Sequence, residues 1–93
     1  MRRALLRSAA FVRAAKRFIG KQKQRAAALR DTLALLEADT FDPRLRTHKL
    51  KGDLAGCWAC SGGYDLRIVF AFVNHAGAEA ILLLSVGTHD EVY

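Results

Sequence analysis

The sequence predicts an α+β domain in which an N-terminal helical hairpin packs on one face of a small twisted antiparallel sheet of three to four strands. Two observations predict this class. Apolar residues recur with a helical period between Phe11 and Leu36, and they alternate with a period of two from Gly56 onward. Ninety-three residues is the length of one small domain, so we expect a single domain over residues 1–93 with any activity on its surface.

The helical hairpin is expected to begin after Ser8, because serine caps helix N-termini with its side-chain oxygen. An apolar stripe at helical spacing follows, and Gly20 then offers a helix stop. The stripe consists of Phe11, Ala14, Ala15, Phe18 and Ile19. A second helix carries Leu29, Leu33 and Leu36 on one face, which completes an αα-hairpin.

The sheet is expected after a connecting stretch, residues 38–53, which holds the only proline. Three strand candidates follow, separated by the turn segments SGGY and NHAGAE: these are GCWACS, DLRIVFAFV and AILLLSVG. The middle strand alternates, so one face is apolar and packs on the helices while the other stays partly open. If the last two strands pair antiparallel, Gly87 to His89 approach Asp65 and Arg67.

Charge is distributed unevenly along the chain, whose net charge is +6. Residues 1–30 hold ten of the fifteen Lys and Arg and no acid. Such a basic field favours a polyanion or an acidic partner, although a solvated helix face is the alternative. The longest apolar run, Ala80 to Leu84, is too short to span a bilayer, and arginines interrupt any secretory signal. We therefore expect a cytoplasmic protein without membrane contact.

Cysteine and glycine patterns exclude two other chemistries. Cys57 and Cys60 have C-x-x-C spacing, but a redox pair belongs at a strand-to-helix turn, and on a strand the two thiols diverge. Zinc would require a second pair of ligands, which only scattered histidines could supply. We expect two reduced cysteines and no metal. The SGG segment is too short to cradle a phosphate, and no helix follows it.

The remaining polar residues suggest phosphodiester chemistry. They are His48, Lys49 and Lys51 in the connector, Asp65 and Arg67 on the middle strand, and His89 and Tyr93 after the last strand. Two imidazoles can act as base and acid, and an arginine can hold the phosphate and stabilise charge on its oxygens. A tyrosine ring can stack on an unpaired base. A simple binding module without catalysis is the alternative.

Three segments closely resemble the RelE/ParE superfamily of bacterial type II toxins, in particular its YafQ-like branch. They are THKLKGDLAGCW, GGYDLRIVFAF and ILLLSVGTHDEVY, of which the terminal GTHDEVY is the most specific. The front half also fits, because family members have a short strand followed by S-x-x-F-x-R-x-x-K-R and a helical hairpin. The resemblance thus covers nearly the whole chain.

The resemblance implies an mRNA interferase that enters the ribosomal A site and cuts translated mRNA. The RNA 2′-hydroxyl is the nucleophile, and neither a metal nor another cofactor takes part. His48 and His89 would be the acid–base residues, with either in either role, and Asp65 would belong to the same site. Arg67 would grip phosphate, and Tyr93 would stack on a base or assist proton transfer. Lys49 and Lys51 are expected to bind RNA.

The chain departs from the family pattern at one position, and the family implies a protein partner. A histidine often stands four residues before the aspartate, and here that residue is Ser61, which cannot transfer protons at neutral pH. The implied partner is a cognate antitoxin. Two alternatives stay open: a gyrase-inhibiting ParE-like toxin that needs no acid–base histidines, and a weakly active remnant that retains antitoxin binding.

Overall fold

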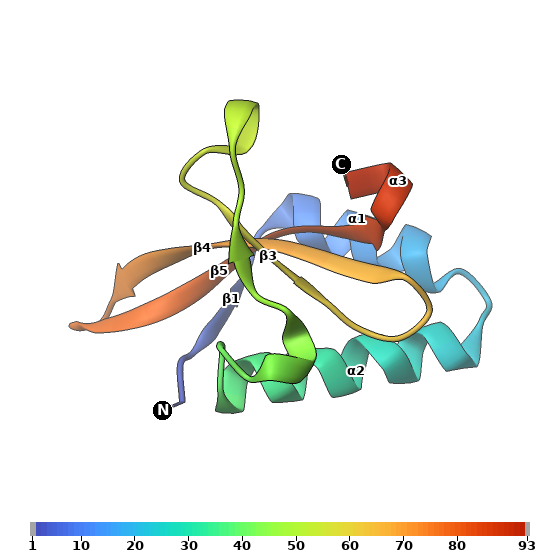
Figure 1. Cartoon of the computed structure of the whole chain (residues 1–93). Coiled ribbons are helices and arrows are strands. Elements are labelled where there is room, and N and C mark those ends of the chain that lie inside the picture. The colour runs from blue at the N-terminus through green and yellow to red at the C-terminus, as the bar shows by residue number, and fades with distance from the viewer. Residues whose placement is uncertain (1, 93) are drawn as a thin grey trace.

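The computed structural model consists of a mixed five-stranded sheet with helices α1 and α2 packed against one face (Figure 1). The structure describes residues 2–92, and the side chains of residues 2–90. In chain order the elements are β1 (Leu5–Arg7), α1 (Ala9–Ile19), α2 (Lys23–Ala38), the 3₁₀ turn η1 (Pro43–Leu45), β2 (His48–Lys49), the 3₁₀ turn η2 (Gly52–Leu54), β3 (Trp58–Ser61), β4 (Leu66–His75), β5 (Ala78–Thr88) and α3 (His89–Val92). The predicted α+β class is confirmed.

The strand order is β1-β5-β4-β3-β2, and every neighbouring pair is antiparallel except β1 with β5. The sheet is therefore larger than the three to four strands expected, because two short strands join its edges. β1 runs parallel to β5, with Leu5 opposite Ile81. β2 forms inside the connector, with His48 opposite Ala59. Within the described part of the chain, no helix is both long and apolar enough to cross a membrane.

The helical hairpin begins and turns where the sequence predicts. The Ser8 hydroxyl accepts a hydrogen bond from the Phe11 backbone N–H at 3.0 Å, which satisfies one of the unpaired donors of the first turn. Gly20 ends α1 with a φ of +51°, a conformation that favours glycine. In Figure 1, α1 lies behind the sheet and α2 runs beneath it.

The core lies between these helices and one face of the sheet. Its buried members include Phe11, Ala14, Phe18, Leu29, Leu36, Leu45, Cys60, Leu66, Ile68, Phe70, Ile81, Leu83 and Val86. A β-bulge in β5 is needed to complete this face, because Val69 pairs with Ser85 but the next residue, Phe70, pairs with Leu83. Leu84 is the extra residue, so Leu83 and Val86 reach the same face although they are three positions apart.

Candidate functional site

The turn between β3 and β4 positions the first group of polar side chains. The Leu66 N–H donates to the Gly63 carbonyl at 3.1 Å, so Tyr64 and Asp65 are the two central residues of a tight turn. Both have a left-handed backbone, with φ of +57° and +56°, which suits the twist of a hairpin but strains residues other than glycine or asparagine.

Close contact with α2 fixes this turn in place. Gly62 begins the turn, and a Cβ atom there would collide with the Thr32 hydroxyl and come within 2.9 Å of Leu66 Cδ2. Only glycine therefore lets β3 approach α2 so closely. The strained turn is held against the second helix rather than extending freely into solvent.

Asp65 connects this turn to the end of β5. One carboxylate oxygen accepts the His89 backbone N–H at 3.2 Å, and the other lies 3.4 Å from Arg67 Nη1. Arg67 Nη1 also donates to the Leu66 carbonyl at 3.0 Å. Because β4 pairs with β5 so that Arg67 faces Gly87, the structure brings Asp65, Arg67 and His89 together, as the antiparallel hairpin predicts.

His48 lies on the short edge strand β2, with an exposed side chain. Its Nδ1–H donates to the carbonyl of Arg46 at 2.9 Å. This acceptor selects the neutral tautomer in which Nε2 carries the lone pair, so Nε2 is the nitrogen that can take a proton. Arg46 adopts a left-handed backbone with φ of +53° at the end of η1.

Strand pairing decides which of the predicted residues share a face of the sheet. His48 lies opposite Ala59, and Ser61 lies opposite Arg67, two residues further along β3. Side chains two residues apart on a strand point the same way, so His48, Ser61 and Arg67 all project from the face away from the helices. β3 and β4 lie between the strand of His48 and the strand that leads into His89.

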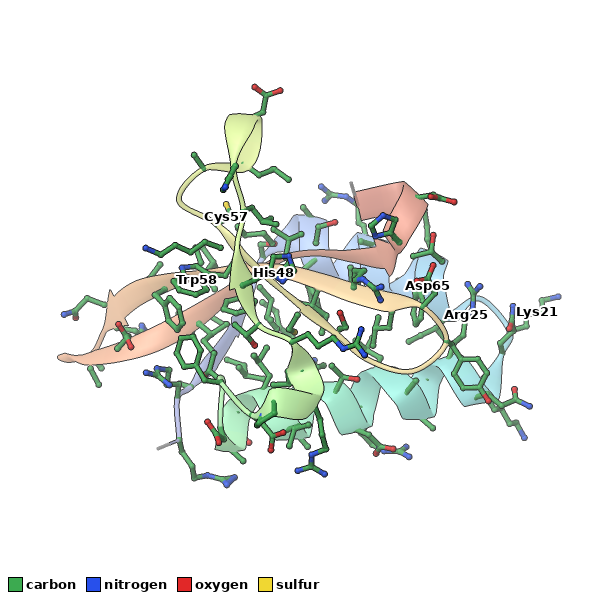
Figure 2. All side chains as sticks on the ribbon, viewed as in Figure 1. Lys21, Arg25, His48, Cys57, Trp58 and Asp65 are labelled. Atoms are coloured by element: carbon green, nitrogen blue, oxygen red, sulfur yellow. The ribbon has the colours of Figure 1, made fainter. Side chains whose placement is uncertain are left out.

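The other predicted RNA-binding residues lie elsewhere. Lys49 points to the opposite face from His48, and its Nζ lies 5.5 Å from the centre of the Trp58 ring. Lys51 is exposed just before η2. Figure 2 labels His48 on the edge strand β2, Trp58 on the neighbouring strand β3, and Asp65 at the β3–β4 turn. The position of Tyr93 lies outside the described residues.

An open groove of about 580 Å³ runs beside Arg67, between α2, the η1 turn and the β3–β4 turn. Its charged and hydroxyl-bearing lining includes Asp31, Arg44, Arg46, Ser61, Asp65 and Arg67. Three arginines thus face two aspartates, and the groove is positive overall. A positive groove suits an anionic phosphodiester substrate.

Sequence reasoning missed Arg44 and Arg46 as residues of the groove. Arg44 is tied to Asp42 by hydrogen bonds of 3.1 and 2.9 Å. The hydrogen bond from the Arg44 side chain lowers the pKa of the Asp42 carboxyl below its usual value. The signal that could have found them is the spacing of the segment PRLRTH, which places two arginines within four residues of His48.

The two cysteines do not line this groove, and the described residues of the site offer no metal-binding cluster. Cys57 and Cys60 are both free, and burial raises the pKa of the Cys60 thiol to about 12. Such a thiol is almost never ionised and is a poor nucleophile. Across the part of the chain that the structure describes, no group of three or more His, Cys, Asp or Glu side chains could hold a metal ion.

This fold is the fold of small bacterial toxins. Escherichia coli YafQ superposes with a TM-score of 0.76 at 16% identity, over 98% of each chain. A YoeB/ParE toxin from Agrobacterium tumefaciens gives a TM-score of 0.72 at 15% identity, over 92% of this chain and 98% of that one. The matching chain of the E. coli DinJ–YafQ toxin–antitoxin complex superposes with a TM-score of 0.74 at 17% identity, over 100% of this chain and 99% of that one.

The sequence itself identifies the family. Residues 3–93 match the model of the YafQ family, described as the bacterial toxin of a type II toxin–antitoxin system. The chain therefore belongs to the YafQ family of the RelE/ParE toxin superfamily. No curated protein sequence gave a significant match to it.

Proposed function

We propose that this protein is the toxin of a type II toxin–antitoxin system and acts in the cytoplasm as an endoribonuclease on translated mRNA, at the ribosomal A site. The observation that carries the proposal is the group formed by Asp65, Arg67 and His89 beside an arginine-lined groove. Membership of the YafQ family supports the toxin class.

Cleavage would proceed by transfer of the phosphodiester to the neighbouring 2′-oxygen. A histidine removes the proton from the RNA 2′-hydroxyl, and the 2′-oxygen then forms a bond to phosphorus. The bond from phosphorus to the 5′-oxygen breaks, and the second histidine donates a proton to that oxygen. The products are a 2′,3′-cyclic phosphate and a 5′-hydroxyl, and the atoms balance without a metal.

The hydrogen-bond partners suggest a role for each side chain. His48 is suited to the base role, because the Arg46 carbonyl leaves the lone pair on Nε2. His89 then serves as the acid, and Asp65 positions it through the backbone bond to its N–H. Arg67 holds the phosphate and stabilises charge on its oxygens. Tyr93 stays a predicted stacking residue, and Lys49 and Lys51 stay predicted RNA contacts.

The partner we assign to this chain is a cognate antitoxin. E. coli YafQ has been crystallised in complex with DinJ, and the fold of that toxin is the fold of this chain. The basic segment of residues 1–30 offers an acidic antitoxin segment a complementary surface. Co-expression with its cognate antitoxin should restore growth to cells that the toxin arrests.

The decisive experiment induces the chain without its partner and maps the 5′ ends of cellular transcripts. Wild type should arrest growth and cut messages within reading frames. His48→Gln and His89→Gln should each lower cleavage by about 100-fold or more, the usual scale for losing an acid–base group. His75→Gln is the matched control, because that histidine lies at the far end of β4 in the turn to β5.

Other outcomes would favour the two alternatives. Growth arrest with intact messages, unaffected by either histidine change, would identify a gyrase-inhibiting toxin and refute the endoribonuclease proposal. Absence of growth arrest, with antitoxin binding retained, would identify a weakly active remnant, for which Ser61 is the suggestive residue.

A further inference from the structure

The groove beside Arg67 continues along α2 to an exposed aromatic ring. A second hollow, of about 380 Å³, shares Asp31, Thr32 and Gly63 with the groove, so the two adjoin along α2. Its far end is lined by Tyr64. Each hollow falls within the size range of small-ligand sites, roughly 300–1,000 Å³. We call these two adjoining hollows, which extend from Arg46 to Tyr64, the α2 channel.

Arg46 is the cation of the α2 channel that has no carboxylate partner in the described part of the chain. Arg67 forms an ion pair with Asp65 and is already assigned to the scissile phosphate, and Arg44 forms an ion pair with Asp42. Among the side chains that the structure describes, the Arg46 guanidinium forms no ion pair or hydrogen bond. An exposed guanidinium that lines a groove and is not paired with a carboxylate suits a phosphate group.

Tyr64 supplies an aromatic surface at the other end of the channel. The residue is 61% exposed, and its ring packs into no aromatic cluster of the described core. Its position in the turn favours glycine or asparagine, so a large ring there is not explained by turn geometry. A phenol ring on a surface next to a cationic groove is the arrangement that binds unpaired bases by stacking.

We infer that the α2 channel binds the ribonucleotides that flank the scissile bond: Arg46 pairs with a phosphate, and the Tyr64 ring stacks on an unpaired base. The inference rests on the proposed function and adds to it a subsite for single-stranded RNA. The subsite contributes affinity and base preference, since neither Arg46 nor Tyr64 is one of the proposed acid–base residues.

Removing the charge of Asp31 should change RNA affinity in the opposite direction from the Arg46 and Tyr64 substitutions. Its carboxylate lines both hollows, and its only ion pair among the described residues is with Arg30, at a loose 3.8 Å. A carboxylate in a channel that binds phosphate repels the ligand. Asp31→Asn should therefore strengthen RNA binding, whereas a change that merely loosened α2 would weaken it.

The binding experiment uses the full chain and a short single-stranded RNA whose 2′-hydroxyls are methylated, so that it cannot be cut. Tyr64→Asn should weaken binding roughly 5- to 100-fold through lost stacking. Tyr64→Phe keeps the ring and should bind as wild type. Because asparagine tolerates the left-handed turn better than tyrosine, loss of binding in Tyr64→Asn cannot be ascribed to misfolding.

The arginine is tested by the salt dependence of the same binding reaction. Arg46→Ala should weaken binding and make the plot of log K against log salt shallower by about 0.7 for the lost phosphate contact. Arg13→Ala is the matched control, because Arg13 is exposed on α1 and the channel is lined by α2. Its salt slope should equal that of wild type.

Transcript mapping separates failure of this inference from failure of the proposed function. If wild type cuts messages, Tyr64→Asn should relax the choice of base at one position next to the cut. Cleavage by wild type, with RNA affinity and cut positions unchanged in Tyr64→Asn, Arg46→Ala and Asp31→Asn, would overturn the subsite alone. Absence of both RNA binding and cleavage in wild type would overturn the subsite together with the proposed function.

Discussion

Ser61 and Arg67 face each other across β3 and β4, on the sheet face that also carries His48. The family pattern often has a histidine at the position of Ser61, and here a hydroxyl lies in the groove beside the arginine. A serine can hydrogen-bond to a substrate oxygen but cannot exchange a proton with it near neutral pH. We therefore expect proton transfer to depend on His48 and His89 alone.

Replacing Ser61 with histidine should raise the cleavage rate, on the order of tenfold, because it adds a titratable group next to the phosphate-holding arginine. The comparison is made in a purified translation system, by following one defined cut over time. Ser61→Asn is the control, since it adds a polar side chain of similar reach without a titratable proton. An equal gain from asparagine, or no gain from histidine, would contradict the acid–base explanation.

The two cysteines should differ sharply in reactivity. With a pKa of about 12, Cys60 is ionised in roughly one molecule in ten thousand at pH 8, whereas Cys57 is only half-buried. Iodoacetamide at pH 8 should label Cys57 in the native protein and reach Cys60 only after unfolding, as read by peptide mass spectrometry. Rapid native labelling of Cys60 would mean that β3 opens on the time scale of the reaction.

The raised pKa of Cys60 also makes the free energy of unfolding depend on pH. The thiol keeps its proton in the folded state, while in the unfolded chain it ionises near the ordinary value of 9.0. The unfolded state therefore binds fewer protons above pH 9, and the free energy of unfolding falls as pH rises from there toward about 12. Below pH 9 this thiol leaves stability unchanged.

At the scale of elements, the contact between the β3–β4 turn and α2 fixes the position of the turn that carries Asp65. Gly62→Ala should destabilise the protein by about 1–3 kcal/mol, because the new methyl group collides with Thr32 and crowds Leu66. Thermal unfolding of the variant measures this loss. Cleavage should fall as well, since the same turn carries Asp65.

A double-mutant cycle tests the cause of that destabilisation. Thr32→Ala removes the hydroxyl that the new methyl group would meet, so Gly62→Ala should cost less in the Thr32→Ala background than in wild type. Additive losses in the two variants would show that the cost of Gly62→Ala does not come from the Thr32 hydroxyl, which would leave the crowding of Leu66 as its source.

The long elements could be predicted from the sequence because local patterns determine them. Ser8 and Gly20 mark the ends of α1, and alternation of apolar residues defines β4. The run LLLS in β5 breaks strict alternation, and only the bulge at Leu84, which depends on pairing with β4, restores it. The strands β1 and β2 are too short to carry a pattern and form only where a longer strand offers hydrogen bonds.

Only the part of the candidate site that follows from the β4–β5 hairpin could be predicted from the sequence. The approach of His89 to Asp65 follows from the hairpin alone, which sequence reasoning can derive. The contribution of Arg46 depends on a left-handed residue after η1, and the opposite orientation of Lys49 depends on the register of a two-residue strand. Such features are set by tertiary pairing, since a shift of one residue reverses every side chain of a strand.

On the scale of the whole molecule, the parallel pairing of β1 with β5 joins residues far apart in sequence. Leu5 must find Ile81 across seventy-six positions, whereas the β4–β5 hairpin closes through two residues. Loop closure of that length is entropically costly and gains its hydrogen bonds only once β5 is already in place. We therefore expect β1 to dock last, so substitutions in it should accelerate unfolding while leaving the refolding rate nearly constant.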